Sequence, residues 1–468
     1  MLKNTLIIGA GEAGKMVARE ILDTSKLSSQ FKLIGFLDDD PLKKSFWGIP
    51  ILGSLKDAEA VLGANAIHTL IIAIPSASRT LITGLLTRLM HLVPDIKIVP
   101  GIYEIIEGDV HWRQIREIKP EDLLGREEVG FELLKLIPFY QDKKIFITGA
   151  GGSIGSEIFR QFLKLPLHSL TAFGRGENNI HYLLTSYGTD QRTRFIIGNV
   201  QDRDKINYEV QLASPDFLFH AAAHKHVPLM ESFPEEAVKN NILGTYYTAL
   251  AALENKVPYF ILVSTDKAVN PTSVMGATKR FAEKMILTLN ARGTTRFLAT
   301  RFGNVLGSRG SVIPTFMKQI QSGGPLTITH AEIERFFMSI PEASRLVIKA
   351  PTVPTGDIFV LHMGRPIKIL ELAKNLLKLS GKTPEEIPIV FTGLRPGEKI
   401  NEELYSSQET LRDTEYEKLM ILENDSAVFT PEELPAIIEE FKQAAFAMDK
   451  KACLALLSKY VPEFKQPS

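Results

Sequence analysis

The sequence of 468 residues has one cysteine, no excess of charge of either sign and no long apolar run. A single cysteine, Cys453, excludes an intramolecular disulfide and a cysteine-rich metal site, and we expect it to be a half-buried thiol in a C-terminal helix. The 54 basic and 54 acidic side chains give zero net charge, which argues against a nucleic-acid-binding protein. No run approaches the ~18 apolar residues of a membrane span. We therefore predict a cytoplasmic protein without a transmembrane segment.

The order of apolar segments indicates a globular chain built twice on the same plan. Hydrophobic residues make up 44% and charged residues 23%, which is typical of a folded protein. Strand-like and helix-like segments alternate after each of two glycine-rich turns, as in parallel sheets with helical crossovers. We predict an α/β protein with two tandem Rossmann-like doubly wound parallel sheets. The expected parts are an N-terminal Rossmann-like domain at 1–100, a connector at 101–142 that packs on the second unit, and a second domain at 143–468.

The first glycine-rich turn, Gly9-Ala-Gly-Glu-Ala-Gly14, joins a short apolar strand to a helix that starts near Lys15. Backbone N–H groups of such a turn approach a pyrophosphate, and an acidic residue after the next strand accepts from a ribose hydroxyl. Asp38 stands at that position. The pattern has two interpretations, a nucleotide site or a degenerate fold that keeps the turn for packing. The nucleotide site would consist of Gly9, Gly11, Gly14 and Asp38.

The second turn, Thr148-Gly-Ala-Gly-Gly-Ser-Ile-Gly155, has the glycine spacing of short-chain dehydrogenase/reductases and lies between a strand and a helix. It predicts a bound nicotinamide dinucleotide, NADP or NAD. The next strand ends at Gly174, where an acidic residue would favour NAD, and Arg175 follows. A guanidinium here can pair with a 2′-phosphate and favours NADP; the alternative is a solvated loop charge. The predicted cofactor-binding residues are Gly149, Gly152, Ser153, Ile154, Gly155, Arg175, Asp202 at the adenine edge, Ala221, Ala222 and Lys279.

A titratable pair, Asp266 and Lys267, follows the apolar strand at 260–264. Ligands of open α/β sheets bind beyond the carboxyl ends of the strands, so chemistry is expected here. Met275 and Lys279 lie four residues apart on one face of the following helix, and short-chain reductases carry a tyrosine where Met275 stands. A thioether has no proton to exchange, so Asp266 and Lys267 are the nearest candidates for proton transfer. The alternative is a surface ion pair with Met275 as simple packing.

Six segments carry one more pattern. They cover residues 148–157, 219–231, 264–271, 275–280, 301–314 and 394–399, and include Ser-Thr-Asp-Lys at 264–267 and Arg-Pro-Gly-Glu at 395–398. Together they resemble the nucleotide-sugar 4,6-dehydratases of bacterial polysaccharide and protein-glycan synthesis, extended short-chain reductases that act on UDP-N-acetylglucosamine. The resemblance spans about residues 115–425. The first unit resembles the extra Rossmann-like domain of the long members, which usually carry transmembrane helices ahead of it.

The resemblance implies a lyase that recycles its cofactor within one turnover. Bound NAD(P)+ takes hydride from C4 of the sugar, water leaves across C5 and C6, and the hydride returns to C6. In similar enzymes the residue matching Lys267 is the base at C5, the residue matching Asp266 is the acid at O6, and Thr265 binds O4. Lys279 would hold the nicotinamide ribose. Whether Asp266 or a water chain takes the proton of the 4-hydroxyl stays open.

The second unit also carries candidates for binding the substrate diphosphate, because a guanidinium pairs with two phosphate oxygens. The predicted substrate-binding residues are Lys225, Asn304, Arg309, Val312, Arg335, Arg395 and Glu398, with Arg301 as a further candidate. Three histidines, His220, His224 and His226, lack nearby carboxylate or cysteine ligands, so no metal site is predicted. The expected partner is UDP-N-acetylglucosamine, and apolar helices around the second unit favour a homodimer.

Two other functions stay open. A C5-inverting dehydratase or an epimerase would pass through the same 4-keto intermediate, although the missing tyrosine counts against a simple 4-epimerase. A dinucleotide-sensing protein that has lost catalysis would bind the cofactor without turnover.

Overall fold

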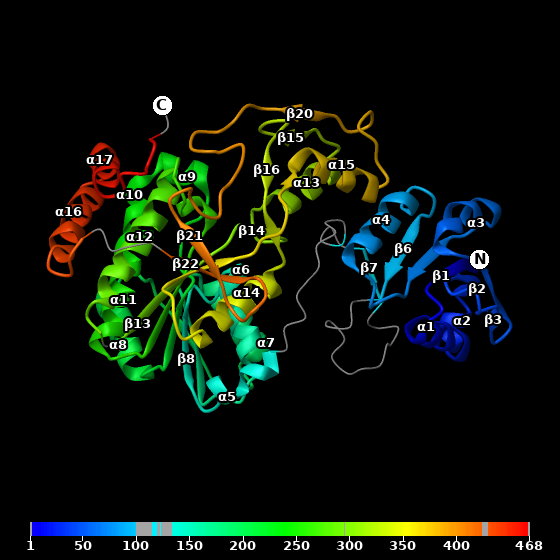
Figure 1. Cartoon of the computed structure of the whole chain (residues 1–468), viewed down its shortest axis with the longest axis horizontal. Helices are drawn as coiled ribbons and strands as arrows, with labels where there is room; N and C mark the ends of the chain where they lie inside the picture. The colour runs from blue at the N-terminus through cyan, green and yellow to red at the C-terminus, as the bar shows by residue number, and fades with distance from the viewer. Residues whose placement is uncertain are drawn as a thin grey trace. The chain divides into compact units, whose positions relative to one another are not determined.

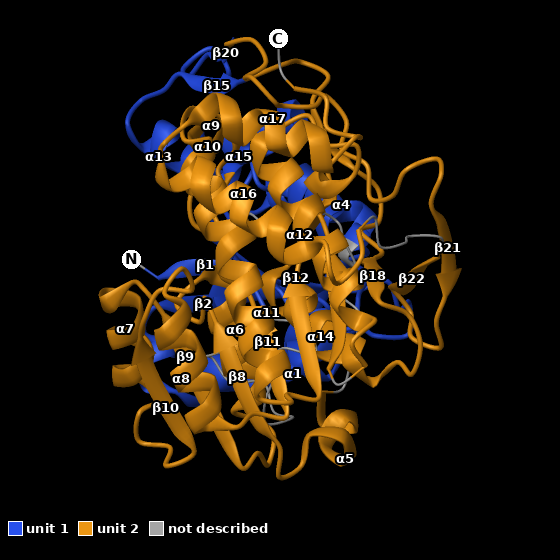
Figure 2. Cartoon of the chain, turned by 90° about the vertical axis from the view of Figure 1, so that its left-hand side faces the viewer, with its two compact units in different colours: residues 1–130, 312–328, 369–390 blue, residues 131–311, 329–368, 391–468 orange. Residues whose placement is uncertain are grey.

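The computed structural model describes residues 2–99, 115–118, 122, 133–293, 295–423 and 429–466. The chain divides into two compact units, which Figure 2 distinguishes by colour. The first comprises residues 1–130, 312–328 and 369–390, and the second comprises residues 131–311, 329–368 and 391–468. The first unit thus includes two short segments that follow the second glycine-rich turn in the sequence. No helix in the described part of the chain is long and apolar enough to cross a bilayer.

The first unit is built on a sheet that is parallel except at its edges. Its described strands lie in the order β3-β4-β2-β1-β5-β6-β7, with antiparallel pairs only at β3–β4 and β6–β7. The strands are β1 (Lys3–Ile8), β2 (Phe31–Leu37), β3 (Ser45–Phe46), β4 (Ile49–Gly53), β5 (Thr69–Ile72), β6 (Asp95–Ile98) and β7 (Arg116–Glu117). The helices are α1 (Glu12–Asp23), α2 (Ser25–Ser28), α3 (Ala58–Ala64) and α4 (Arg79–Leu89). The later segments of this unit add α13 (Val312–Gln321), β15 (Leu326–Ile328), α15 (Ile369–Leu379) and β20 (Ile389–Phe391).

Much of the predicted connector at 101–142 lies outside the described residues. Where it is described, β7 pairs with β6, so this part packs on the first unit and not, as predicted, on the second. Residues 133–140 belong to the second unit, where the buried Tyr140 hydroxyl donates to the carbonyl of Ile348 at 2.6 Å.

The second unit contains a larger sheet whose described strands lie in the order β10-β9-β8-β11-β12-β13-β18-β22-β21. The strands from β10 to β18 run parallel, and β22 and β21 continue the sheet in antiparallel fashion. The strands are β8 (Lys144–Thr148), β9 (Ser169–Gly174), β10 (Thr193–Ile197), β11 (Phe217–His220), β12 (Tyr259–Val263), β13 (Arg296–Arg301), β18 (Ile358–Leu361), β21 (Thr410–Asp413) and β22 (Leu419–Glu423). Short pairs are formed by β14 (Asn304–Val305) with β17 (Phe337–Met338) and by β16 (Glu334–Arg335) with β19 (Ile367–Lys368).

Helices cover both faces of this sheet (Figure 1). Alternate strand residues point to opposite faces, so Phe146 enters one core while Ile145 and Ile147 enter the other. The first core lies under α8 (Arg203–Ala213), α11 (Gly244–Glu254) and α12 (Val274–Asn290), and the second lies under α6 (Ser153–Phe162) and α14 (Ile340–Lys349). The remaining helices are α5 (Ile137–Tyr140), α7 (Glu177–Tyr187), α9 (Val227–Ser232), α10 (Pro234–Ala237), α16 (Leu434–Phe446) and α17 (Lys450–Tyr460). With both faces covered, side chains that meet a ligand come from the ends of the strands.

The C-terminal helices α16 and α17 pack on α12. Phe441 of α16 meets Phe281 of α12 edge to face with 4.9 Å between ring centroids. Cys453 lies in α17 as predicted but is fully buried, not half-buried, and burial raises the pKa of its thiol to about 11. Since the chain covers α12 with its own helices, this part of the apolar surface no longer favours a homodimer. The oligomeric state stays a prediction.

Candidate active site

A pocket of about 220 Å³ opens at the carboxyl ends of β8, β9 and β11. These strands are parallel neighbours, so the turns that follow them meet at one edge of the sheet. The walls are the second glycine-rich turn, the turn at 174–176 after β9, residues 198–200 after β10 and the alanines at 221–223 after β11. The pocket is therefore where the sequence predicts the dinucleotide.

The glycines of the second turn have separate structural reasons. Gly149 has a φ of +65°, and a Cβ there would lie 2.6 Å from the carbonyl of Ala221. A Cβ at Gly155 would overlap the carbonyl of Gly149, so this residue lets α6 approach the turn. Gly152 caps α6 without a side-chain hydrogen bond, which leaves the first backbone N–H groups of the helix for an anion. Turn and helix together fit a dinucleotide diphosphate.

Half of the predicted cofactor residues line this pocket, namely Gly149, Gly152, Arg175, Ala221 and Ala222. Ser153, Ile154 and Gly155 form the first turn of α6 beside it. Asp202 instead caps α8, where its Oδ1 accepts from the backbone N–H of Lys205 at 3.0 Å. Its adenine contact stays a prediction. The sequence analysis missed further lining residues that come from α7, from the turn after β10 and from the segment before α11, including Asn179, Asn199 and Asn240.

Arg309 lies in the dinucleotide pocket, although the sequence analysis assigned it to the substrate. Its guanidinium donates to Asn179 Oδ1 at 2.6 Å and to the carbonyl of Gly151, and its backbone N–H donates to Ser153 Oγ at 3.3 Å. The side chain thus bridges the glycine-rich turn and α7. With Arg175 it supplies a second positive charge to this pocket.

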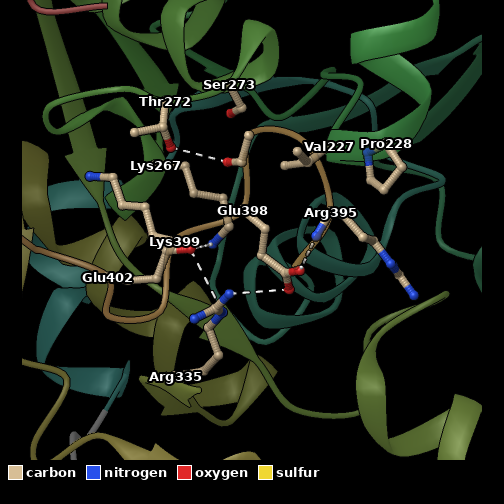
Figure 3. Close-up of a pocket in the computed structure, with 11 residues that line it drawn as sticks. Val227, Pro228, Lys267, Thr272, Ser273, Arg335, Arg395, Glu398, Lys399 and Glu402 are labelled. Carbon is tan, nitrogen blue, oxygen red and sulfur yellow. Dashed lines mark hydrogen bonds and ion pairs between the residues drawn. The ribbon is translucent and has the colours of Figure 1, made fainter. Parts of the chain in front are cut away.

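Thr265, Asp266 and Lys267 follow β12 in a tight turn, and Lys267 lines a second pocket of about 100 Å³ (Figure 3). Asp266 is fully buried, and its Oδ1 accepts from Thr265 Oγ1 at 2.9 Å and from Lys267 Nζ at 3.0 Å. Its Oδ2 has no hydrogen-bond partner among the described residues. A Cβ at Gly303 would come within 3.0 Å of this oxygen, so the glycine leaves room beside it.

Three oxygens hold the Lys267 ammonium. Besides Asp266, Nζ lies 3.2 Å from Asn304 Oδ1 and 3.4 Å from Glu402 Oε1. Burial alone would lower the pKa of Lys267, but the Asp266 and Glu402 carboxylates raise it. Burial raises the pKa of Asp266, and the charge of Glu402 adds to this rise while Lys267 opposes it. The site therefore pairs a carboxyl that retains its proton to higher pH with a tightly held amine.

Met275 and Lys279 are both buried on α12, as the helical spacing predicts. Lys279 Nζ donates to the carbonyl of Val263, the last residue of β12, at 2.8 Å. Burial lowers the pKa of Lys279 to about 8. Burial, with the Lys279 charge nearby, lowers the pKa of His220 to about 3. His220 is neutral and its ring nitrogens lie 2.8 Å from Thr148 Oγ1 and 3.1 Å from Thr245 Oγ1.

The predicted substrate residues differ in how free their side chains are. Arg395 and Glu398 line the Lys267 pocket, and the Arg395 guanidinium points away from the Lys267 ammonium (Figure 3). Arg335 also lines it, but its guanidinium is held by Glu398 at 3.3 Å and by the carbonyl of Ile400 at 3.0 Å. Burial lowers the pKa of Lys225, and the positive charges of Arg309 and Lys267 lower it further. Lys225 therefore lies near both of these side chains. Val312 begins α13, which belongs to the first unit.

Arg301 lines neither of these two pockets and is fully buried, which corrects its assignment to the substrate diphosphate. It ends β13 fully buried, with Nη2 2.8 Å from Glu283 Oε2 and Nη1 3.2 Å from Glu409. Glu283 also accepts from Ser264 Oγ at 2.6 Å and pairs with Arg280 at 3.2 Å. Burial alone would raise the pKa of Glu283, but the two guanidinium groups lower it to about 2. This cluster joins the end of β13 and the residue after β12 to α12, next to the turn at 265–267.

The acidic residue associated with the first glycine-rich turn, Asp38, is hydrogen-bonded to other groups of the protein. Asp38 Oδ2 accepts from the backbone N–H of Ala10 at 2.6 Å, and Oδ1 accepts from Lys43 Nζ at 2.9 Å. A Cβ at Gly9 or Gly14 would collide with backbone, whereas one at Gly11 would meet nothing within 4 Å. Gly9, Gly14 and Asp38 thus have structural roles without a ligand. The nucleotide site stays a prediction. Gly11 is the one of the three glycines for which packing within the protein gives no reason to exclude a side chain.

Residues 145–424 match the family described as polysaccharide biosynthesis protein, and residues 2–100 match the family described as CoA-binding domain. The chain is 47% identical to the probable polysaccharide biosynthesis protein EpsC of Bacillus subtilis, over 89% of this chain and 70% of EpsC. It is 42% identical to the capsular polysaccharide biosynthesis protein CapD of Staphylococcus aureus, over 94% of this chain and 74% of CapD. It is 38% identical to the UDP-glucose 4-epimerase of Rickettsia akari, over 58% of this chain and 80% of that protein.

Among solved structures, Pen from Bacillus thuringiensis matches with a TM-score of 0.56 and 32% identity, over 64% of this chain and 98% of Pen. The doubly wound α/β fold predicted from the sequence is confirmed by this match and by the two sheets. Within the described residues, no group of three or more histidine, cysteine or acidic side chains is arranged to hold a metal ion. The family match covers more than half of the chain, so the protein belongs to the polysaccharide biosynthesis protein family of nucleotide-sugar dehydratase- and epimerase-like short-chain dehydrogenase/reductases, as its motifs predict.

Proposed function

We propose that the protein is a UDP-N-acetylglucosamine 4,6-dehydratase that keeps NADP or NAD tightly bound and acts in the cytoplasm. The observation that carries the proposal is the pair of the buried Asp266 and the partly buried Lys267, at 3.0 Å, beside a pocket rich in charged side chains. An ordinary alcohol dehydrogenase needs one proton-exchanging group near the redox carbon, and here Met275 stands at its place on α12. An elimination of water needs both an acid and a base, which this pair supplies.

The residues of the second unit would divide the work as follows. A bound nicotinamide dinucleotide would accept hydride from C4 of the sugar and give it back at C6. Lys267 takes the proton from C5 once its own proton has left, and Asp266 donates its proton to O6 as the C6–O6 bond breaks and water departs. Thr265 binds O4, and the Lys279 ammonium stabilises negative charge near the ribose. The acceptor of the 4-hydroxyl proton is Asp266 or a water chain.

For the substrate diphosphate we propose Arg395 and Lys225, because the guanidinium of Arg335 is already held by the protein. Glu398 and Arg335 pair at 3.3 Å and shape the pocket wall. Asn304, a predicted substrate residue, instead accepts from the Lys267 ammonium at 3.2 Å and orients it. Arg309 is proposed as a dinucleotide ligand.

The direct test is incubation of the protein with UDP-N-acetylglucosamine, followed by mass spectrometry and NMR of the sugar nucleotide. We expect the loss of one water, a 4-keto-6-deoxy product with retained configuration at C5, and no net accumulation of reduced cofactor. An unchanged sugar nucleotide would contradict the proposed dehydratase activity. Stoichiometric release of NADPH would identify a dehydrogenase instead, and an inverted C5 would identify the inverting dehydratase.

The second candidate is a UDP-sugar epimerase, which is favoured by the 38% identity to a UDP-glucose 4-epimerase. An epimerase would return a product of unchanged mass with inverted C4, so the same experiment separates the two. Met275 argues against it, because a 4-epimerase needs a proton-exchanging group at that point.

Arg175 is predicted to decide the choice of dinucleotide. Replacing it by serine in Arg175→Ser removes a charge-assisted contact to a 2′-phosphate, so the affinity for NADP should fall by about 10–100-fold while that for NAD changes little. The measurement is a binding titration with both cofactors. Arg203→Ser is the control. Arg203 begins α8, pairs with Glu254 of α11 at 3.7 Å and does not line the pocket. Equal loss for both cofactors, or none, would contradict the assignment.

A further inference from the structure

Glu402 contacts Lys267, one member of the catalytic pair, from outside the sheet (Figure 3). It stands in the irregular segment 392–409 between β20 and β21, where no helical or strand periodicity marks it. Its Oε1 lies 3.4 Å from Lys267 Nζ and 3.7 Å from Arg335 Nε. Its Oε2 is buried and has no hydrogen-bond partner among the described residues. A buried carboxylate with one unsatisfied oxygen is costly, so its retention at this point calls for a reason.

The segment that carries Glu402 is fastened to the catalytic unit on both sides of it. Before Glu402, the backbone N–H of Glu334 donates to the carbonyl of Ile400 at 3.1 Å, and after it the Arg301 guanidinium donates to the carbonyl of Leu404 at 3.3 Å. These contacts hold Glu402 with its Oε1 3.4 Å from the Lys267 ammonium. Two carboxylates, Asp266 and Glu402, therefore contact the one amine.

Like charges in a shared buried site push the protonation equilibria of the two carboxyls apart. Asp266 is the more deeply buried of the two and has one cation beside it, so it is the carboxyl whose protonation equilibrium is pushed to higher pH. Glu402 has a second cation, Arg335, within 4 Å and stays ionised. The same two carboxylates make Lys267 harder to deprotonate, and a stronger base once its proton has left.

We propose that Glu402 is a positioning residue of the catalytic site, which fixes Lys267 against Asp266 and sets the protonation state of both. This inference rests on the proposed function, since it assigns Asp266 as the acid and Lys267 as the base. Glu402 lines the same pocket as Lys267, and the role proposed for it is exercised through Lys267. The charged groups that act on the three residues are Arg335 from β16, Lys399 from the segment of Glu402, and Lys225 from the loop after β11.

The variant Glu402→Gln keeps the shape of the side chain and removes its charge. Without the second carboxylate, both Asp266 and Lys267 should titrate at lower pH, so both limbs of the kcat–pH profile should move down by about 1–3 units. Glu403→Gln is the matched control, because Glu403 is the next residue, is exposed and contacts Lys399 at 3.1 Å rather than Lys267. Its profile should coincide with that of the wild type.

A second readout does not depend on activity. Trace labelling with acetic anhydride at pH 8.5, quantified by mass spectrometry against the exposed Lys442, reports how much of Lys267 is unprotonated. Its labelling in Glu402→Gln should rise at least about tenfold over the wild type, which is one unit in pKa. If the wild type dehydrates no UDP-sugar but this rise is seen, the proposed function fails and the inference about Glu402 stands.

Unchanged labelling together with unchanged limbs would overturn the inference. So would a lower kcat with limbs in their wild-type positions, because that is what a merely structural residue gives. If Glu402→Gln does not melt like the wild type, Glu402→Asp replaces it. The shorter side chain withdraws the charge from Nζ, so both limbs should shift in the same direction by a smaller amount, and limbs that stay in place would again overturn the inference.

Discussion

Replacement of Asp266 by asparagine is expected to lower the rate of water loss from UDP-N-acetylglucosamine by about 10²–10⁴-fold, the usual contribution of a general acid. Asp266→Asn keeps the acceptor oxygen that Thr265 and Lys267 bind at 2.9 and 3.0 Å, so the turn after β12 retains its contacts. It removes the proton that the free Oδ2 would carry to the leaving oxygen. The rate is measured from the mass of the sugar nucleotide over time.

The loss should lie in kcat rather than in substrate binding, since Asp266 is fully buried and its Oδ2 contacts only the reacting oxygen in the proposed mechanism. Asp204→Asn serves as the control, because Asp204 is exposed on α8. A variant Asp266→Asn that keeps the wild-type rate within a few fold would place the acid elsewhere and remove the basis of the mechanism.

The parts of the site that the sequence predicts are those that follow directly from a local pattern. The turn at 149–155 lies between a strand and a helix that are both recognisable from their apolar residues, and Asp266 follows a buried strand. In such cases the chain direction and the strand end already determine the position of the side chain. The positions of Met275 and Lys279 follow from a local pattern too, because residues four apart on a helix share one face.

The residues that the sequence analysis missed or misplaced depend on contacts between distant segments. Glu402 comes from a segment without periodicity, and only the folded chain brings it to Lys267, 135 positions away in the numbering. The guanidinium of Arg309 is suited to bind a phosphate, but the residue type does not tell whether that phosphate belongs to the substrate or to the cofactor. Arg301 was assigned to the substrate because a guanidinium pairs with two phosphate oxygens, which also does not tell whether the side chain is free to do so. The burial of β13 over its last five residues, with partners from α12, makes Arg301 part of the core.

Removal of the buried charge of Glu283 is expected to lower the free energy of unfolding by about 3–5 kcal/mol, the usual cost of breaking a buried ion pair. Glu283→Gln is close in shape to the wild type, but it removes the charged partner that Arg301 has at 2.8 Å and one of the charged partners of Arg280, at 3.2 Å. The effect is measured by urea unfolding at pH 7 followed by circular dichroism. Glu440→Gln, which removes an exposed pair with Lys459, should shift the unfolding midpoint far less.

The pH dependence of this difference follows from the ionisation of Glu283. Its pKa in the folded protein is about 2, below the ordinary value of about 4.3 that it regains on unfolding. A carboxyl with a lowered pKa stabilises the fold above the ordinary value, and this contribution is lost as the pH falls toward the folded value. The gap in unfolding free energy between wild type and Glu283→Gln should therefore be full at pH 7 and narrow steadily from about pH 4.3 to about pH 2. A gap of constant size over this range would show that Glu283 stabilises the protein through its shape and not through its charge.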